Sequence, residues 1–470
     1  MKNKQYTVYL QLFLSALMLM LSTPPFKFFY LSFFALSIAL RTLNYYQKPF
    51  LNGFMFGFFY NLMSMYWITY VLSKYGNFNY ILSFSLCLLL VAYLSLYPAI
   101  FFFVFFKFKN SLKKIFVPLV FGFFWVVLEF IRSRILTGFP WILIGYTQYN
   151  FLPFIQIASF GGVYLVSFFV IFFNLSVYVL FEKERYKIVP LLCSLIIFIF
   201  IVVYGKNEIE RVKKALGKKR AMKVILVQGN IDQSQKWVKN LQKEIIKKHI
   251  DMTRKHIDGD TKLVIWSETA LPIILGADAE VTEFFREEMK GFDVPLITGF
   301  VGFKWDEKGK PGLTNSAGIF YKGELIDRYD KVHLVPFGEY VPLQRLLFFV
   351  NKLVAVAGDF LQGETIKTCK FNNLSFGIMI CYESIFPEIS KKLNVLGADI
   401  LVNLTNDAWF GRSPAPYQHF AMSIFRAVEN RKYLIRVANT GISGIITPWG
   451  EPVGITSLYT DEVISGVVYY

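Results

Sequence analysis

Acidic side chains are almost missing from the first 205 residues of this 470-residue chain. That part has three acids against 15 Lys and Arg, a net charge of +12, whereas residues 206–470 carry the other 35 bases and 30 acids. The chain is 54% hydrophobic, which is too apolar for one ordinary soluble domain. We therefore expect two parts in different solvents, with a boundary near Gly205.

Cysteine and histidine are also scarce, with four of each. The histidines show no metal-ligand spacing, so no metal site is predicted. Cys87 and Cys193 lie in apolar stretches, where we expect their side chains to pack as small apolar groups without a chemical role. Cys369 and Cys381 lie in the second part, where a predicted hairpin sets Cys369 opposite Phe376. That register leaves the two thiols roughly 17 Å apart, too far for a disulfide.

Seven apolar stretches are long enough to cross a bilayer, which takes roughly 20 residues. They are residues 6–23, 26–43, 50–72, 79–106, 114–136, 153–181 and 187–205. The first is not expected to be a cleaved signal peptide, because further spans follow at once. With a cytoplasmic N-terminus, inside segments carry eleven Lys and Arg and outside loops carry four. This orientation places the chain after Gly205 outside the cytoplasm.

A basic linker, residues 206–221, joins the two parts. It fits a solvated linker helix or contact with anionic headgroups, and both readings stay open. Residues 222–470 alternate short apolar strands with polar helices, which predicts a layered α/β domain. One amphipathic helix is expected at Gln235–Asp258, with Trp237 near its apolar face. The last apolar run, Val463–Tyr470, is too short to span a membrane.

Three candidate reactive residues follow predicted strands. Glu268, Lys331 and Cys381 come after the apolar runs that end at residues 266, 329 and 380. Sites in α/β sheets lie at the carboxyl ends of strands. A carboxylate can deprotonate a thiol, and an ammonium and the N–H of Tyr382 can stabilise an oxyanion. Each residue alone also fits a loop, surface or core position, and spacing does not show that the three meet.

The surrounding motifs resemble the nitrilase superfamily, whose catalytic Glu, Lys and Cys lie on a four-layer αββα sandwich. The resemblance covers residues 222–458, and its motifs are Trp266–Ala270, Asp330–Glu339, Ile380–Glu383 and Asn406–Gly411. With the seven spans, the whole chain resembles the apolipoprotein N-acyltransferase family. The most specific strings are Lys331–Pro342, Asn406–Gly411, and Gln228–Asn230 leading to Lys236-Trp237.

This resemblance implies an activity. An acyl chain moves from a phospholipid to the α-amino group of the S-diacylglyceryl-cysteine of an apolipoprotein, the last step of lipoprotein maturation. The route is a ping-pong reaction through a thioester, with Cys381 as nucleophile, Glu268 as base and Lys331 as oxyanion stabiliser.

The resemblance also implies a setting for that reaction. Glu339 is expected to orient Lys331 or relay a proton, and Trp237, Tyr382 and Glu383 are expected to shape the site. No cofactor and no nucleic acid are implied, and membrane lipid is a partner. The place is the inner membrane of a bacterium, with the catalytic domain in the periplasm. Oligomeric state is left open.

Two further features carry expectations. The segment Val341–Phe360 is expected to be either a buried core helix or an amphipathic arm at the bilayer surface that gates lipid entry. Members of the family commonly end with a further span, which this sequence does not show before Tyr470, so the C-terminus is expected to stay with the outer domain.

The sequence also bears on two other functions. A membrane-tethered amidase would use the same three residues with water as acceptor, but seven spans exceed what a tether needs. A transporter or lipid-binding scaffold with an inactive enzyme domain conflicts with intact Glu, Lys and Cys motifs. The spans also lack the buried run of opposed charges expected for ion coupling. Glu129 is the one acid inside them, and its spacing allows a pair with Arg132 one turn on.

Overall fold

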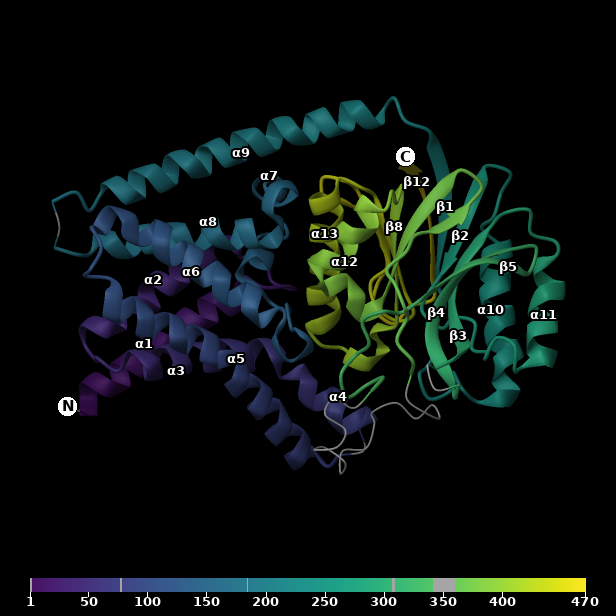
Figure 1. Ribbon diagram of the computed structural model, residues 1–470, viewed down its shortest axis with the longest axis horizontal. Coiled ribbons are helices and arrows are strands. Elements are labelled where there is room, and N and C mark those ends of the chain that lie inside the picture. Colours follow the sequence, from purple (N-terminus) through teal and green to yellow (C-terminus); the bar gives the residue numbers. More distant parts are fainter. Residues whose placement is uncertain (1, 77, 184, 307–308, 341–359) are drawn as a thin grey trace. The chain divides into compact units, whose positions relative to one another are not determined.

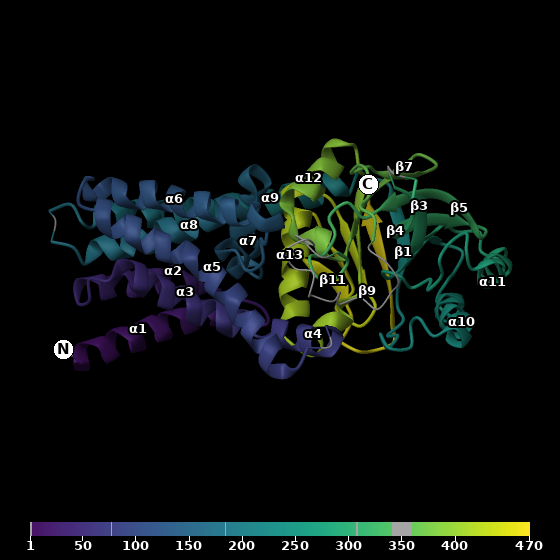
Figure 2. The same cartoon turned by 60° about the horizontal axis from the view of Figure 1, so that its bottom comes forward.

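The chain forms two compact units, a helical unit and an α/β unit (Figure 1, Figure 2). The computed structural model describes residues 2–76, 78–183, 185–306, 309–340 and 360–470. The helical unit comprises Met1–Ser73, Phe78–Arg211 and Ser413–Phe425. The α/β unit comprises Lys74–Asn77, Val212–Arg412 and Arg426–Tyr470.

The helical unit is built from apolar helices in each of the seven predicted ranges. They are α1 (Lys2–Leu21), α2 (Ser32–Arg41), α3 (Pro49–Met65), α4 (Trp67–Tyr75), α5 (Tyr80–Phe108), α6 (Val117–Arg132), α7 (Leu152–Ile155), α8 (Ala158–Leu180) and α9 (Val189–Leu216). Within the described ranges, four apolar helices have the length and composition to cross a membrane, namely Tyr80–Phe108, Lys114–Arg132, Ala158–Leu180 and Val189–Leu216. The helical segments Gln5–Leu21 and Phe29–Asn44, in the first two predicted stretches, are apolar but shorter, so the count of seven spans stays a prediction.

These helices show large apolar side chains on their outer surface and polar groups inside. Leu89, Phe123 and Phe200 are 67%, 64% and 69% exposed, as expected for helices that face lipid. Inside, Asn174 of α8 is fully buried, and its Nδ2 donates to the carbonyl of Ser32 (2.8 Å). The unit therefore uses polar side chains to join neighbouring helices.

Helix α9 runs without a break through the predicted domain boundary. Gly205 lies inside this helix, where an added Cβ would lie 1.8 Å from the carbonyl oxygen of Pro153. The glycine thus permits a close approach within the helical unit rather than ending a span. The basic linker continues the same helix as far as Leu216.

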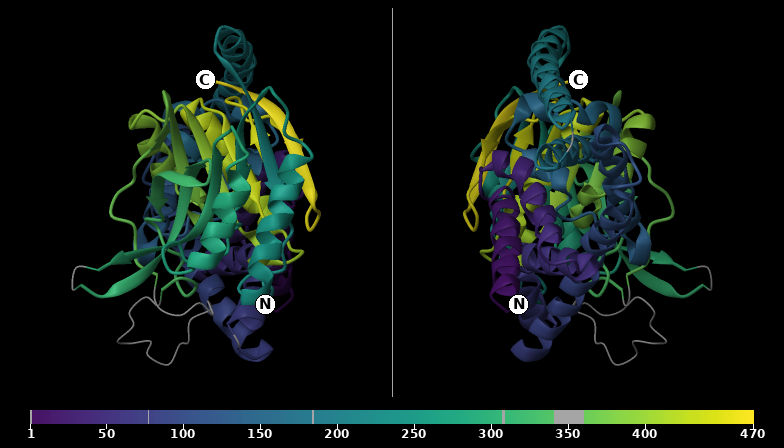
Figure 3. Two further views of the ribbon diagram at one scale, coloured as in Figure 1. Left: turned by 90° about the vertical axis from the view of Figure 1, so that its right-hand side faces the viewer. Right: turned by 90° about the vertical axis from the view of Figure 1, so that its left-hand side faces the viewer.

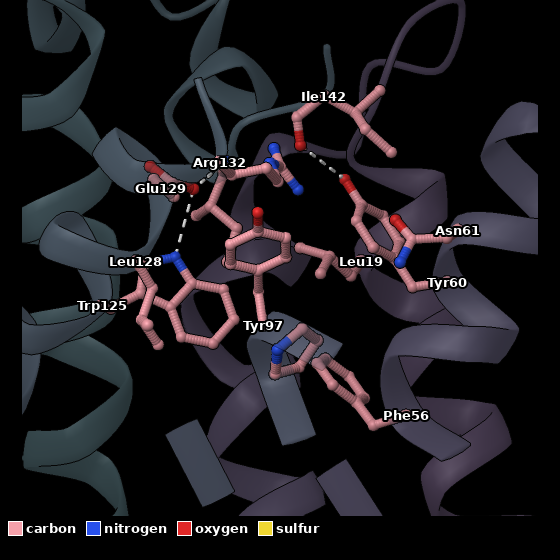
Figure 4. A pocket seen from close by; sticks show the side chains of 12 residues that line it. Leu19, Phe56, Tyr60, Asn61, Tyr97, Trp125, Leu128, Glu129, Arg132 and Ile142 are labelled. Carbon is pink, nitrogen blue, oxygen red and sulfur yellow. Dashed lines mark hydrogen bonds between the residues drawn. The ribbon is translucent and has the colours of Figure 1, made fainter. Parts of the chain in front are cut away.

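A cavity inside the helical unit is lined by polar groups from α3, α5 and α6 (Figure 4). Glu129 Oε1 accepts hydrogen bonds from Trp125 Nε1 (3.1 Å) and the N–H of Ile144 (2.8 Å). An Arg132 guanidinium N–H donates to the carbonyl of Trp141 (3.0 Å). Glu129 and Arg132, both in the described part of α6, form no ion pair with each other, so the expected pairing is wrong. The segment after α6 supplies a main-chain partner to each of them instead.

The α/β unit contains two six-stranded sheets with the orders β12-β1-β2-β3-β4-β5 and β11-β10-β9-β8-β7-β6. The strands are β1 (Ala221–Gln228), β2 (Thr261–Trp266), β3 (Leu296–Trp305), β4 (Pro311–Tyr321), β5 (Glu324–Asp330), β6 (Cys369–Phe371), β7 (Leu374–Ile380), β8 (Ile400–Thr405), β9 (Leu434–Ala438), β10 (Gly444–Ile446), β11 (Pro452–Ile455) and β12 (Glu462–Tyr469). In the first sheet β1, β2 and β3 are parallel, and in the second β7, β8 and β9 are parallel.

Aliphatic side chains from both sheets meet in one buried core, including Leu226 and Ile265 from the first sheet and Ile378 and Val402 from the second. Helices α10 (Gln242–Arg254) and α11 (Ala279–Met289) cover the outer face of the first sheet (Figure 1, Figure 3). On the second sheet, α12 (Pro387–Val395) packs against β7, and Asn430 at the end of α13 (Ala415–Asn430) bonds to Ser390 of α12. The predicted αββα sandwich is confirmed.

Three local predictions can be compared with this fold. Cys369 pairs with Phe376 as expected, and among the described residues no disulfide joins Cys369 to Cys381. The helix expected at Gln235–Asp258 is wrong at its start, because residues 233–237 form a turn and α10 begins at Gln242. The apolar run at the end of the sequence is strand β12, which pairs antiparallel with β1.

Candidate active site

The three candidate reactive side chains follow strand ends in the α/β unit. Glu268 lies just after β2, while Lys331 and Cys381 directly follow β5 and β7. The charges of these groups act on one another, since Glu268 and Lys331 both shift the pKa of Cys381, and Glu268 and Cys381 both shift that of Lys331. The fold therefore brings the three groups together in one buried place.

Glu268 has one bound and one available carboxylate oxygen. Its side chain is 7% exposed, and Oε1 accepts a hydrogen bond from Asn315 Nδ2 (2.8 Å). The same amide donates to Glu339 Oε1 (2.7 Å). Oε2 of Glu268 has no hydrogen bond to any described residue. The arrangement fixes the carboxylate while leaving one oxygen able to accept a proton.

A close backbone contact holds the turn that carries Glu268. A Cβ on Gly299 of β3 would lie 2.4 Å from the nitrogen of Thr269 and 2.8 Å from Cα of Glu268. Thr269 itself has φ +46°, in the region that L-residues rarely adopt. The turn after β2 thus lies directly on β3, and glycine leaves the room it needs.

Lys331 forms a buried ion pair with Glu339. Its Nζ lies 2.9 Å from each carboxylate oxygen of Glu339, and the two side chains are 1% and 8% exposed. Burial disfavours the ammonium, but Glu339, Glu268 and Cys381 outweigh that effect, so the pKa of Lys331 is raised. Lys331 is therefore a permanent cation at the site.

Cys381 occupies a strained backbone position between β7 and a short 3₁₀ helix, Cys381–Ile385. Its φ is +50°, which costs of order 1–3 kcal/mol for a non-glycine residue. Burial and then the Glu268 carboxylate raise the pKa of the thiol to about 12, while Lys331 lowers it. The resting thiol therefore keeps its proton at neutral pH and needs an adjacent base to react.

Glu383 connects the segments on either side of the site. Its fully buried carboxylate accepts hydrogen bonds from Tyr329 Oη and from the N–H groups of Val332, His333 and Ile380, at 2.8 to 3.1 Å. Val332 follows Lys331 and Ile380 precedes Cys381, so one carboxylate fixes the backbone beside both. Burial raises the pKa of Glu383, and its donors oppose that rise.

The two predicted aromatic residues lie in different settings. Tyr382 is nearly buried, and its ring packs edge-on against Phe386 (centroids 5.2 Å apart) and beside His333 (5.8 Å). Trp237 lies half-buried in the turn before α10, not on a helix face as expected. For Trp237 the structure gives neither a hydrogen bond nor a ring contact to another described residue.

The motif Asn406–Gly411 has a structural role in the part of the chain described. Asp407 and Arg436 form an ion pair (2.8 Å) in which both side chains are fully buried. Asn406 Nδ2 donates to Gln233 Oε1 (2.6 Å), which ties the turn after β1 to the end of β8. This motif therefore supports the strand ends around Cys381.

Sequence reasoning missed two polar side chains of the site, Asn315 and Lys236. Asn315 binds both carboxylates from inside β4, where nothing marks it in the sequence. Lys236 is 1% exposed, and its Nζ donates to the main-chain oxygen of Glu268 (2.9 Å). Its place in the Lys236-Trp237 string was the available signal. The arm expected at Val341–Phe360 lies outside the described residues, apart from Phe360.

Comparison with known proteins assigns both parts of the chain to families. The carbon-nitrogen hydrolase family profile matches residues 223–468, and the profile of the apolipoprotein N-acyltransferase N-terminal domain matches residues 15–176. Nit3 from Saccharomyces cerevisiae, a nitrilase-superfamily structure, matches at 21% identity and a TM-score of 0.41, over 53% of this chain and 90% of its own. The profile match alone identifies residues 223–468 as a carbon-nitrogen hydrolase domain.

Curated relatives extend the match to the whole chain. The apolipoprotein N-acyltransferase of Geobacter metallireducens is 38% identical over 90% of this chain and 81% of its own length. That of Rickettsia typhi is 36% identical over 88% and 82%. The chain belongs to the apolipoprotein N-acyltransferase family. It is an acyltransferase and a membrane protein.

Proposed function

We propose that this enzyme moves an acyl chain from a phospholipid to the α-amino group of the N-terminal S-diacylglyceryl-cysteine of apolipoproteins. The observation that carries the proposal is the buried cluster of Glu268, Lys331 and Cys381, which combines a proton acceptor, a cation and a thiol. The names of the curated relatives support the acceptor and the amide product. The long apolar helices fit two lipid substrates.

In the first half-reaction, Glu268 takes the proton of Cys381, and the thiolate attacks the ester carbonyl carbon of the phospholipid. Lys331 and the main-chain N–H of Tyr382 stabilise the oxyanion. The ester C–O bond then breaks, and the leaving glycerol oxygen takes the proton from Glu268. A lysophospholipid departs and a thioester remains on Cys381. The raised pKa of the thiol fits this order, because the proton stays until Glu268 removes it.

In the second half-reaction, the neutral α-amine of the lipoprotein attacks the thioester carbonyl carbon. Glu268 accepts a proton from the amine as the C–N bond forms, and the C–S bond breaks. The proton returns to Cys381, which restores the resting thiol. Acyl transfer through a covalent intermediate divides one difficult exchange into two easier steps, which is the basis of ping-pong kinetics.

Four further residues have positioning roles in this proposal. Glu339 holds the ammonium of Lys331, and Glu383 fixes the backbone beside Lys331 and Cys381. Tyr382 and Trp237 shape the approach to the thiol.

Mass spectrometry of the purified protein tests the function. After incubation with phospholipid, we expect one acyl mass on the peptide that contains Cys381, removable by hydroxylamine and absent in Cys381→Ala. Cys369→Ala is the matched control, because Cys369 is a buried thiol in the same unit with a pKa raised to about 12, chiefly by burial. The adduct should remain in that variant.

The second substrate separates transfer from hydrolysis. Addition of a diacylglyceryl lipopeptide with a free α-amine should move the acyl group onto the peptide. An adduct lost to water without transfer would identify a hydrolase. No adduct from any phospholipid would overturn the proposal.

We also propose a membrane arrangement. Residues 1–205 form a domain of seven spans with a cytoplasmic N-terminus, and residues 222–470 lie in the periplasm at the inner membrane. The loop charges support it, since the inside segments carry eleven Lys and Arg and the outside loops carry four. In spheroplasts, a membrane-impermeant maleimide should label Tyr470→Cys without permeabilisation. Labelling only after the cytoplasm is opened would contradict this orientation.

A further inference from the structure

Lys236 is a buried cation on a turn that both sheets hold in place. The turn follows β1, and its Ile231 N–H donates to Asn439 Oδ1 (2.9 Å) while Asn439 Nδ2 donates back to the carbonyl of Ile231 (2.8 Å). Gln233 accepts from Asn406 in the same way. Since Asn406 and Asn439 follow β8 and β9, the turn is fixed against the second sheet. Lys236 therefore enters the interior on a rigid support.

The contacts of Lys236 differ from those of other buried cations in the unit. Lys331 and Arg436 each bind a carboxylate directly, at 2.9 and 2.8 Å. Lys236 has no ion pair with any described residue, and one of its three N–H groups bonds to the main-chain oxygen of Glu268 (2.9 Å). Buried ammonium groups are normally paired because burial without a counter-charge is costly. The fold alone therefore gives no reason for this charge.

The neighbouring groups give a reason. The charges of Glu268 and Cys381 both act on Lys236, and both favour its ammonium form. Lys331 is already paired with Glu339, so Lys236 is a second cation whose charge acts on Glu268. When the proton moves from Cys381 to Glu268, the negative charge moves to sulfur and then to the oxyanion. The charge of Lys236 thus interacts with both groups between which the proton moves.

We propose that Lys236 is a positioning residue for the acylation step, whose ammonium holds the backbone of Glu268 and offsets the negative charge that develops at Cys381. This inference rests on the proposed function, which gives Cys381 its role. It predicts an effect on the thiol that exists without either lipid substrate, and that effect can be measured directly.

The pH dependence follows from the groups that face Lys236. Burial lowers its pKa to about 8, although Glu268 and Cys381 oppose the fall. His249 of α10 also faces it, but burial lowers the pKa of His249 to about 4, so that ring stays neutral between pH 6 and 9. Below pH 8, Lys236 is charged, and in this proposal its ammonium favours the thiolate form of Cys381. Above pH 8, it loses its proton and this influence disappears.

The experiment measures maleimide labelling of Cys381 in the full-length detergent-solubilised protein. Site-specific mass spectrometry reads the Cys381 peptide, so the other three cysteines do not interfere. Lys236→Met removes the charge and the hydrogen bond, Lys236→Gln keeps a donor without charge, and Lys236→Arg keeps the charge. Lys239→Met, an exposed lysine in the same segment, is the matched control.

We expect wild type to label about tenfold faster than Lys236→Met at pH 6.5, which corresponds to one pKa unit at the thiol. The ratio should fall toward one as the pH rises to 9. Lys236→Gln should behave like Lys236→Met. Lys236→Arg should keep the faster labelling at pH 9, because a guanidinium does not lose its proton there. Lys239→Met should match wild type throughout.

The inference would be overturned if the ratio of wild-type to Lys236→Met labelling rates did not change with pH, or if Lys236→Gln labelled as fast as wild type. Lys236 would then have only a structural role, as a hydrogen-bond donor. Comparison of Lys236→Gln with Lys236→Arg keeps the test decisive even if Lys236→Met does not fold. The outcome is separate from the proposed function, because labelling needs no phospholipid. If the wild-type enzyme forms no thioester, the proposed function is refuted, but the labelling ratios still test the role of Lys236.

Discussion

In the helical unit, the buried charges of Glu129 and Arg132 bind main-chain groups of one loop, whereas in the α/β unit Lys331 and Glu339 bind each other. In the helical unit, the two charged side chains hydrogen-bond to main-chain groups that would otherwise lack partners. The pair in the α/β unit leaves the ammonium beside a thiol and a second carboxylate. Burial of charge alone therefore does not mark a reactive site, whereas the thiol and the second carboxylate beside Lys331 do.

The two units also differ in where their apolar atoms lie. Helices of the first unit expose Phe123 and Phe200, while the second unit encloses its aliphatic residues between two sheets. A unit with a lipid-facing exterior has its polar groups inside, where they join helices. The α/β unit places Glu268, Lys331 and Cys381 just after strand ends, where they can meet a substrate.

The sharpest way to break this comparison is to remove one cation from each unit. Lys331→Met should lower acyl-enzyme formation by about 10³-fold, since a lost oxyanion donor typically costs 10²–10³ and Glu339 is also left unpaired. Arg132→Met should lower it less than about tenfold per folded molecule, because its lost bond holds a loop. The rate of thioester formation, read by mass spectrometry, measures both.

Arg132→Lys is the control for charge in the helical unit, and its rate should match wild type. If Arg132→Met unfolded at the same temperature as wild type but formed the thioester 10³-fold more slowly, the charges of the helical unit would take part in the chemistry.

Glu383 offers the next largest effect. Glu383→Gln replaces an acceptor of four hydrogen bonds by a group that can accept at one atom only. We expect kcat to fall by about 10²-fold, because small shifts of Lys331 and Cys381 misplace the reacting atoms. Glu388→Gln, an exposed glutamate in the next helix, should leave kcat unchanged. An unchanged kcat in Glu383→Gln would remove the positioning role.

Much of the site could be predicted from the sequence because its residues follow apolar strands. Glu268, Lys331 and Cys381 each come after such a run, and the register of Cys369 with Phe376 followed from a tight turn. These features depend on local patterns that one sequence carries. The family motifs then supplied the roles.

The features that were missed depend on tertiary contacts. Asn315 reads as an ordinary strand residue until β4 sets it beside two carboxylates. The spacing of Glu129 and Arg132 favours a pair along one helix turn, but Ile144, fifteen residues on, supplies a donor instead. The left-handed backbone at Cys381, a non-glycine residue, has no sequence signal either.

The pH behaviour of Cys381 sharpens the electrostatic side of the comparison. Glu268→Gln removes a charge that raises the thiol pKa, so the thiolate fraction at pH 8 rises and maleimide labelling should become about tenfold faster. Lys331→Met removes a charge that lowers the pKa, so labelling should slow by a similar factor. In wild type the rate should keep rising with pH, because the pKa is about 12. Slower labelling of Glu268→Gln would mean that this carboxylate already deprotonates the resting thiol.

The smallest effect is expected in the helical unit, at Asn174. Its amide joins α8 to the chain at Ser32 (2.8 Å) and Ser37 (3.2 Å). Asn174→Leu should cost about 0.6–1.7 kcal/mol, as interhelical hydrogen bonds in membranes do, while thioester formation stays within twofold of wild type. Thermal unfolding in detergent measures the first quantity. Ser176→Ala, which loses a bond within α8 alone, is the control. Lost acylation in a stable Asn174→Leu protein would show that the interior of the helical unit shapes the reaction as well as the fold.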